Sequence, residues 1–260
     1  MLIDTHAHLN FPDFEKDLDE VIKRSVATEV EKIICVSNNI ADSKKAIEIA
    51  KKYPKTVFTA VGIHPQQTDP QNSISLINQI KELEKLATEN KVIAIGECGL
   101  DFSPAPPPEL DRTKEEQIFL FKEQIKLAIK LNLPILVHSR KSFTETIEVL
   151  ADFKNLRGIF HCYSGGKKGI DKINKLGFFF GVDGNLTYDD GLKNVFSLIP
   201  LNKIVLETDC PFLAPAPFRD HRSEPAHIKT IAKALAKIQN VSFEKVAQIT
   251  TANARQLFLV

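Results

Sequence analysis

The stretch Ile3-Asp4-Thr5-His6-Ala7-His8-Leu9 shows a pattern that recurs along the chain: an apolar strand that ends in titratable side chains. A short apolar lead predicts a buried strand, and two histidines follow at positions i and i+2. Because side chains alternate along a strand, His6 and His8 project from the same face at its end. Imidazole is a common ligand of transition metals, so the pair is either half of a metal site or two surface histidines.

Apolar strands alternate with helical patterns about eight times, in a chain of 260 residues that is close to the ~250 typical of a (β/α)₈ barrel. The strands are apolar throughout, as expected when both faces of a parallel sheet are covered. A doubly wound open sheet is the competing fold, but no glycine-rich phosphate loop follows a strand. We predict an α/β fold, a single TIM-like barrel of the metal-dependent hydrolase type over residues 1–260. The further strands are expected at 31–37, 56–63, 91–97, 134–138, 157–161, 178–182 and 203–207. The main helices are expected at 11–28, 41–52, 73–90, 109–131, 142–153 and 168–176, followed by more than one helix over 224–257.

Composition excludes several classes of protein. Hydrophobic residues make up 43% and charged residues 26%, and the formal net charge is +1, so any contact with a polyanion must be local. No apolar run approaches the roughly 20 residues of a membrane span, and the first residues lack the pattern of a signal peptide. The cysteines are far apart and form no C-x-x-C pair, which favours a reducing, cytoplasmic setting. They are Cys35, Cys98, Cys162 and Cys210.

Titratable side chains recur at the predicted strand ends. In a barrel these C-terminal strand ends face one mouth, where barrel enzymes place their catalytic groups. Burying so many titratable groups without a cation would leave unpaired polar groups at a cost of roughly several kcal/mol. The sequence therefore predicts a metal centre, with candidates His6, His8, His64, Glu97, His138, His161 and Asp209.

The mixture of ligand types limits which metal ions would bind. Imidazoles and carboxylates without thiolates suit Mg²⁺, Mn²⁺ or Zn²⁺. The candidates exceed what one tetrahedral ion needs, and a carboxylate can bridge two ions about 3.5–4 Å apart. We expect Glu97 to be this bridge, and Asp209 to be both a ligand and the acceptor of a proton from an attacking water. Glu207 either orients a ligand from behind or is a buried carboxylate paired with a lysine or arginine.

Seven short motifs occur in a fixed order along the chain. Together they resemble the TatD family of metal-dependent deoxyribonucleases, within the amidohydrolase-like barrels. The motifs are Asp4-x-His6-x-His8-Leu9, Gly62-Ile63-His64-Pro65, Gly96-Glu97-x-Gly99-Leu100-Asp101, His138-x-Arg140, His161-x-x-Ser164-Gly165, Glu207-Thr208-Asp209-x-Pro211 and Thr251-x-Asn253-Ala254-Arg255.

The resemblance implies a barrel that hydrolyses DNA phosphodiester bonds with a pair of divalent metal ions. Glu97 takes the bridging place, and Glu97 and Asp209 are the expected catalytic residues. Two departures bear on substrate preference: Asn10 stands where the family often has aspartate, and segment 103–108 is rich in proline where a tyrosine and basic residues are common. The implied metal ligands are His6, His8, Glu97, His138, His161 and Asp209.

Contacts with substrate are expected from residues at the same mouth. Arg140 follows His138 by two positions, so it either holds a phosphate by paired hydrogen bonds or forms a salt bridge to a neighbouring loop. His64 is a second candidate for substrate binding. Aromatic residues beyond strand ends, Phe212 among them, either stack on unpaired bases or pack in the core. We favour 3′–5′ exonuclease-like action on single-stranded or frayed DNA ends, by a metal-activated water.

Two rival functions remain open at this point. An amidohydrolase-type barrel could act on an amide, ester or lactone, but such enzymes often use a lysine as the metal bridge, and Glu97 stands at that place. A non-catalytic metal-binding adaptor is the other rival. Loss of ligands is expected in such a degenerate relative, and none of the expected ligands is missing.

Overall fold

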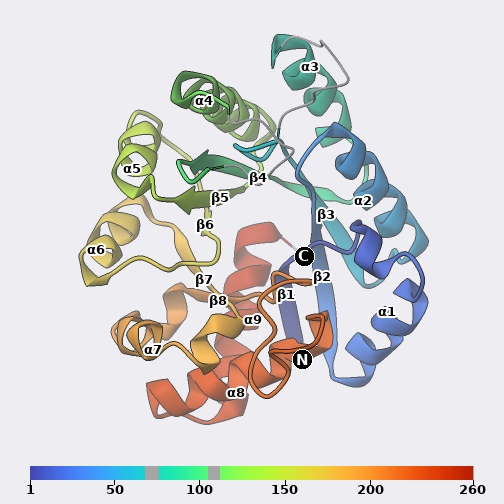
Figure 1. Ribbon diagram of the computed structural model, residues 1–260, viewed down its shortest axis with the longest axis vertical. Coiled ribbons are helices and arrows are strands. Elements are labelled where there is room, and N and C mark those ends of the chain that lie inside the picture. The colour runs from blue at the N-terminus through green and yellow to red at the C-terminus, as the bar shows by residue number, and fades with distance from the viewer. Residues whose placement is uncertain (68–75, 105–111, 260) are drawn as a thin grey trace.

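The computed structural model describes residues 1–67, 76–104 and 112–259. Within these ranges, eight parallel strands pair in chain order, and helices surround them (Figure 1). This confirms the predicted (β/α)₈ barrel. The strands are β1 (Leu2–Ala7), β2 (Val30–Val36), β3 (Val57–Val61), β4 (Val92–Asp101), β5 (Ile135–Arg140), β6 (Gly158–Phe160), β7 (Phe179–Val182) and β8 (Ile204–Leu206).

Each strand is followed by a helix or helical turn that returns the chain to the start of the next strand. The α-helices are α1 (Leu18–Ala27), α2 (Ile40–Lys52), α3 (Leu76–Ala87), α4 (Lys114–Leu131), α5 (Phe143–Ala151), α6 (Lys167–Leu176), α7 (Asp190–Phe196), α8 (Ile228–Gln239) and α9 (Phe243–Phe258). Short 3₁₀ turns are η1 (Pro12–Phe14), η2 (Gly184–Thr187), η3 (Leu201–Lys203) and η4 (Pro225–His227).

The barrel closes between β1 and the segment that follows β8. Ala7 pairs with Cys210 in a parallel bridge. The His8 N–H donates to the Cys210 carbonyl at 2.7 Å, and the Asp209 N–H donates to the His6 carbonyl at 2.9 Å. The closing contact therefore lies beside residues that the sequence analysis proposed as metal ligands.

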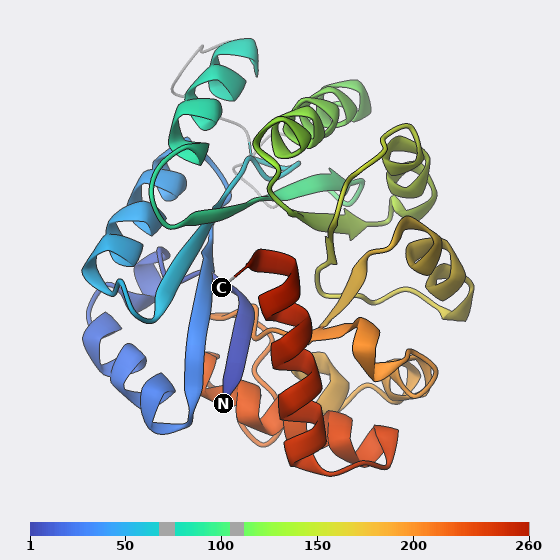
Figure 2. The same cartoon turned by 180° about the vertical axis from the view of Figure 1, so that it is seen from behind.

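Apolar side chains fill the inside of the barrel, and α9 covers its N-terminal end (Figure 2). Leu257 and Phe258 pack into the inner cluster. The side-chain amide of Asn253 donates to the carbonyl of Ile204, at the start of β8. With this end covered, the opposite end of the barrel is left for a site. The inner cluster consists of Ile3, Ile34, Val36, Ala60, Ala94, Leu136, Ile159, Phe179, Val205, Ala254, Leu257 and Phe258.

The fourth strand is longer than the sequence pattern indicated. Pairing with β5 continues beyond Glu97, through Cys98 with Val137 and Gly99 with His138. Gly99 has φ +147°, and a Cβ atom there would lie 2.0 Å from the His138 carbonyl oxygen, so the close approach requires glycine. Glu97 thus lies within β4, and the prediction that it ends the strand is wrong.

Several helix boundaries also differ from the predicted ones. The pattern over 11–28 is divided into η1 and α1, because Pro12 begins a separate turn. The helix expected from residue 109 begins at Lys114, where the Thr113 hydroxyl accepts from the Glu116 N–H and Glu116 completes a capping box. Residues 73–75, 105–111 and most of the proline-rich segment 103–108 lie outside the described residues.

Membrane spanning can be judged only for the helices in the described ranges. Of these, none combines the length and the apolar character needed to cross a bilayer.

Candidate metal centre

The residues proposed as metal ligands lie at one end of the barrel. His6 is in β1, Glu97 in β4 and His138 in β5, while His161 immediately follows β6. Because the strands are parallel, their C-terminal ends meet at the same mouth. The structure therefore brings together side chains that are far apart in sequence. The residues gathered there are His6, His8, His64, Glu97, His138, His161 and Asp209.

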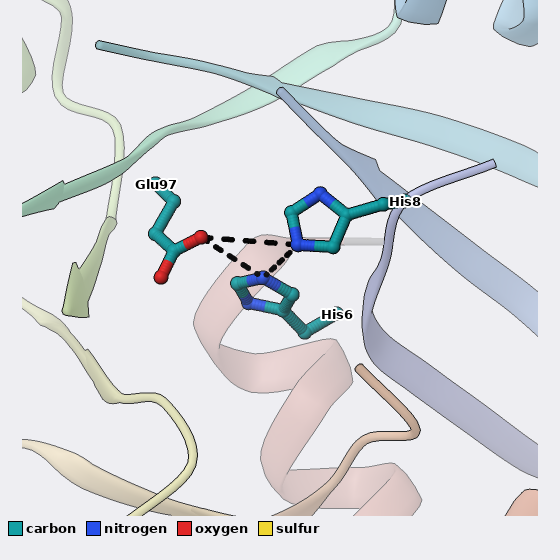
Figure 3. A group of neighbouring side chains, drawn as sticks. All are labelled: His6, His8 and Glu97. Carbon is teal, nitrogen blue, oxygen red and sulfur yellow. Dashed lines mark hydrogen bonds and ion pairs between the residues drawn. The ribbon is translucent and has the colours of Figure 1, made fainter. Parts of the chain in front are cut away.

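Glu97 lies between two groups of histidines. Its Oε2 is 3.6 Å from His6 Nε2 and 3.8 Å from His8 Nε2 (Figure 3). Its Oε1 is 2.6 Å from His138 Nδ1 and 3.1 Å from His161 Nε2. The two oxygens of one carboxylate thus face different pairs of imidazoles, which is the arrangement expected of a bridging ligand.

Asp209 completes the group around the first histidine pair. Its Oδ1 lies 3.6 Å from His6 Nε2 and 3.4 Å from His8 Nε2. The two Nε2 atoms are themselves 3.2 Å apart. The other nitrogen of the His8 ring, Nδ1, is 3.0 Å from the Val36 carbonyl, which fixes this ring with Nδ1 as donor and leaves Nε2 as an acceptor.

The second histidine pair is held from behind by carboxylates. His161 Nδ1 lies 3.3 Å from Glu207 Oε1, and Glu207 also accepts the backbone N–H of Cys162. His138 Nε2 lies 3.1 Å from Asp101 Oδ2. Glu207 therefore stands where the sequence analysis placed an orienting carboxylate, and no lysine or arginine pairs with it among the described residues.

His64 lies beside this second group. Its Nε2 is 3.9 Å from Glu97 Oε1, and its ring is 4.4 Å from that of His138, measured between centroids. His64 Nδ1 accepts the Gln66 N–H at 3.1 Å, so the hydrogen of the neutral ring is on Nε2. Burial, together with the charge of His138, lowers the pKa of His64 to about 3. This ring is therefore neutral near pH 7 and carries a donor directed to the centre.

Ionisation around the first pair favours negative carboxylates. Burial lowers the pKa of His6. Burial also disfavours the charged form of His8, but Asp209 and Glu97 outweigh it and raise its pKa. Burial would raise the pKa of Asp209, and the surrounding imidazoles lower it instead. The carboxylate is therefore ionised at neutral pH.

Around His138 and His161 the carboxylates are likewise ionised and the imidazoles tend to be protonated. Burial would raise the pKa of Glu97, but His161 and His138 hold it well below its usual range. Burial opposes protonation of His161, yet Glu97 and Glu207 raise its pKa well above the usual value. The carboxylates thus stabilise positive charge on the neighbouring imidazoles, and a bound cation between them would meet the same field.

The residues present fit divalent cations. Three groups of side chains each place one ligand atom per residue within 4.8 Å of the others. Two Nε2 atoms 3.2 Å apart, both facing ionised carboxylates, gain more from a shared cation than from one weak hydrogen bond. The three groups are His6, His8 and Glu97; His6, His161 and Glu207; and His64, Glu97 and His138.

Comparison with known proteins identifies the family. The family model described as "TatD related DNase" matches residues 3–259. The chain belongs to this family. It is 35% identical over 268 residues to "Uncharacterized metal-dependent hydrolase YabD" of Bacillus subtilis, covering 100% of both proteins. It is 33% identical over 261 residues to "Deoxyribonuclease TATDN3" of Homo sapiens, covering 99% of this chain and 94% of that protein.

A solved structure agrees with this assignment. The crystal structure of YjjV, a TatD homologue from Escherichia coli K12, superimposes with a TM-score of 0.88 at 28% sequence identity, covering 100% of this chain and 98% of that one. The TatD resemblance predicted from the ordered motifs is therefore confirmed, and the TatD relatives named above are described as metal-dependent hydrolases or deoxyribonucleases.

Two carboxylates at this TatD-type site had no role in the sequence analysis. Asp4 is fully buried and accepts from both the N–H and the hydroxyl of Thr208. Asp101 contacts His138 and accepts from Ser103. Strand alternation could have found both, because Asp4 shares a face with His6 and Asp101 shares one with Glu97.

Arg140 and Asp183 also lie at this rim. Arg140 ends β5 and is exposed, and within the described residues its guanidinium has no partner, so the alternative of a salt bridge to a neighbouring loop is not realised there. Asp183 follows β7 and accepts the Asn185 N–H at 2.7 Å. Burial raises the pKa of Asp183 to about 6. Among the described residues the Arg140 guanidinium is therefore unpaired, whereas Asp183 is hydrogen-bonded to the loop that follows β7.

Proposed function

We propose that this chain is a metal-dependent phosphodiesterase that cleaves DNA, with two divalent ions (Mg²⁺, Mn²⁺ or Zn²⁺) in the candidate centre. The observation that carries the proposal is the position of Glu97, whose two oxygens face separate pairs of imidazoles. Membership of the TatD-related DNase family and the likeness to a human protein named a deoxyribonuclease support DNA as the substrate.

The ligands divide into two sets that share Glu97. His6, His8 and Asp209 would hold one ion, and His138 and His161 the other. When bound, such ions supply a water of lowered pKa and neutralise charge on the phosphate. The protein's part is to fix these ligands and to limit access of bulk water.

Asp209 would take the proton of the attacking water. Its pKa is lowered, so its oxygens are available as acceptors at neutral pH, and the side chain is 13% exposed at the mouth. Glu207 stays behind His161, fixing the orientation of that ring through Nδ1.

Two residues would bind the phosphate. Arg140 has an exposed guanidinium that suits paired hydrogen bonds to phosphate oxygens. His64 is neutral and presents its Nε2 hydrogen toward the centre, so it would donate to a phosphate oxygen. The two donors stand on β5 and after β3, on the side of the mouth that holds His138.

The substrate would be the single-stranded or frayed end of a DNA molecule, cleaved in a 3′–5′ exonuclease-like manner. The net charge of +1 supplies no broad positive surface for duplex DNA. Phe212, 51% exposed, lies three residues after Asp209, and its ring centroid is 6.4 Å from that of His8. An exposed ring at this place suits stacking on an unpaired base.

We also propose that the protein works in the reducing environment of the cytoplasm. All four cysteines are free thiols, and burial raises the pKa of Cys35 to about 12, which makes this thiol unreactive. Thiol titration of protein purified without a reductant tests this setting, because oxidised pairs would contradict it.

The decisive experiment measures hydrolysis of end-labelled single-stranded and nicked DNA by the purified protein with Mg²⁺ or Mn²⁺. Wild type is expected to release nucleotides, and Glu97→Ala and Asp209→Asn to be inactive. Asp190→Asn, on the exposed start of α7, is the matched control. Intact DNA with wild type, or full activity in either site variant, would overturn the proposal. Bound metal without turnover of any ester would favour an adaptor, and turnover of an amide, ester or lactone alone would favour the amidohydrolase rival.

A further inference from the structure

A cavity lies beside the metal centre, between the loop that follows β5 and the loop that follows β6. Its volume is about 310 Å³, within the ~300–1,000 Å³ typical of small-molecule sites. His161 forms part of its wall and also belongs to the histidine–carboxylate cluster, with Nε2 3.1 Å from Glu97 Oε1. A ligand in this cavity would therefore stand next to the place where the phosphate is cleaved.

The walls of the cavity are fixed by hydrogen bonds. The Ser142 hydroxyl donates to the Leu100 carbonyl at 2.7 Å, and the Ser139 hydroxyl lies 3.0 Å from that of Thr146. Across the cavity, the Tyr163 hydroxyl donates to the Gly166 carbonyl at 2.9 Å. These contacts hold both loops in place, so the cavity exists before any ligand binds.

Gly165 packs directly against the Tyr163 ring. A Cβ atom at Gly165 would lie 2.7 Å from that ring, so a larger residue there would push the ring out of place. The tyrosine side of the cavity is therefore rigid as well.

Several other side chains that line the cavity have polar groups without a partner among the described residues. Thr144 and Ser164 are exposed, and their hydroxyls make no hydrogen bond within the part of the chain that the structure describes. The Lys141 ammonium, also exposed there, has no ion pair in those ranges. The ring of Phe143 is half-buried: its centroid is 6.1 Å from that of Phe160 and 6.0 Å from the Lys172 ammonium, and the ring adds an apolar surface to the lining. Glu145 and Cys162 also line the cavity, which thus offers free hydroxyls, one cation, one carboxylate that can accept from base N–H groups, and an aromatic ring.

This combination selects one class of ligand. A free phosphate would use the cation and hydroxyls but not the aromatic surface, and an apolar ligand would leave the hydroxyls unpaired. A nucleoside uses all of them, because a flat base packs on an aromatic ring while its sugar hydroxyls and base edges form hydrogen bonds. The attached phosphate would then reach the centre past His161.

We propose that this cavity binds the terminal nucleoside of the DNA strand, on one side of the phosphate that is cleaved. The inference rests on the phosphodiesterase function proposed above and adds its specificity site. The cavity is half open to solvent beside His161, so a nucleoside seated in it would place the phosphate attached to it at the centre, and the terminal position of the strand would be recognised there.

The test blocks the cavity from its rim. Thr144→Trp fills it from α5, and Ser164→Phe fills it from the opposite loop. Glu148→Trp is the control, since Glu148 is exposed on the same helix but does not line the cavity. Three substrates are compared with Mg²⁺: the 5′- and 3′-(p-nitrophenyl phosphate) esters of thymidine, and methyl p-nitrophenyl phosphate, which has no nucleoside.

Both filling variants should raise KM for the preferred thymidine ester on the order of tenfold, as expected for one lost base contact. Activity on the methyl ester should stay unchanged, and Glu148→Trp should behave as wild type. Preference for one thymidine ester tells which end is bound. Equal loss on the methyl and thymidine esters, or no loss in either filling variant, would overturn the inference.

A binding measurement separates this inference from the proposed function. Calorimetric titration of the Mg²⁺-loaded protein with thymidine 5′-monophosphate should show weaker binding in both filling variants, while titration with inorganic phosphate should be unaffected. If no ester is cleaved, the phosphodiesterase proposal fails, and this difference in binding still supports the nucleoside pocket. Identical binding of thymidine 5′-monophosphate to all variants would refute the pocket whatever the activity.

Discussion

Thr208 donates two hydrogen bonds to the buried carboxyl group of Asp4, from its N–H to Oδ1 at 3.0 Å and from its hydroxyl to Oδ2 at 2.6 Å. Asp4 lies two residues before His6, and Thr208 lies directly before Asp209. The contact therefore holds the segment that carries His6 against the segment that carries Asp209. Thr208→Val removes the hydroxyl and leaves a buried oxygen without that donor. We expect a loss of about 1–3 kcal/mol in the free energy of unfolding, measured in urea.

The control for this change is Thr88→Val, whose hydroxyl bonds the Lys85 carbonyl on the exposed end of α3. This variant should stay within about 0.5 kcal/mol of wild type. Equal losses in the two variants would mean that the Asp4–Thr208 contact has no special weight.

Asp101 is expected to orient His138. Its Oδ2 lies 3.1 Å from His138 Nε2, and its other oxygen accepts from Ser103. Asp101→Asn should weaken binding of the metal beside His138 by about 10–100-fold, because partners behind a ligand have effects of this size. Metal content after dialysis against graded chelator measures it. Asp152→Asn, at an exposed ion pair with Lys122, should retain the wild-type metal content.

Arg140 is expected to bind substrate without holding metal. Arg140→Met should raise KM for single-stranded DNA on the order of tenfold, through loss of paired hydrogen bonds to phosphate, and leave the metal content unchanged. Lys154→Met, which also removes an exposed positive charge, is the control. A fall in metal content, or an equal KM change in the control, would contradict a role in phosphate binding.

Phe212 is expected to stack on a base. Phe212→Ala should weaken binding of a short single-stranded oligonucleotide on the order of tenfold, since each base–aromatic contact contributes about 1–3 kcal/mol. Phe212→Tyr keeps the ring and should bind as wild type does. Fluorescence anisotropy of a labelled oligonucleotide measures both. Leu198→Ala removes another exposed apolar side chain, and an effect as large as that of Phe212→Ala would argue against stacking.

Asp183 should make stability depend on pH. Burial raises its pKa from 3.8 to about 6, so the folded protein binds its proton more tightly than the unfolded chain does. The stabilisation is fully present below the unfolded pKa and is lost as pH rises through about 6. Relative to Asp183→Asn, wild type should lose about 2 kcal/mol between about pH 4 and pH 7. Urea unfolding in chelator tests this, and parallel pH profiles would refute it.

Most of the fold was predictable because its strands and helices follow from local sequence patterns. Each apolar run is a strand, and the ordered motifs placed Glu97 and His138 on neighbouring strands. The extension of β4 was not predictable, because Cys98 and Gly99 continue the strand only through pairing with β5. Their own sequence gives no apolar run.

The candidate site was predictable as a set of residues but not as a geometry. Alternation along β1 placed His6 and His8 on one face, whereas the division of the two Glu97 oxygens between histidine pairs depends on side-chain rotamers. The Asp4–Thr208 contact joins residues 204 positions apart and has no local signal. The roles assigned to the ligands, and the single-domain organisation, stay predictions.

The closing contact of the barrel has a consequence for how the proposed metal would act on the whole chain. His8 and Asp209 come from opposite ends of the sequence and meet where the first strand joins the segment after the last. A cation held by both side chains would cross-link two segments about 200 positions apart in the sequence. Cross-links that close long loops remove the most conformational entropy from the unfolded chain. Thermal resistance and catalytic competence would then rise together with metal occupancy, and a nascent chain would acquire both only after its final quarter had folded into place.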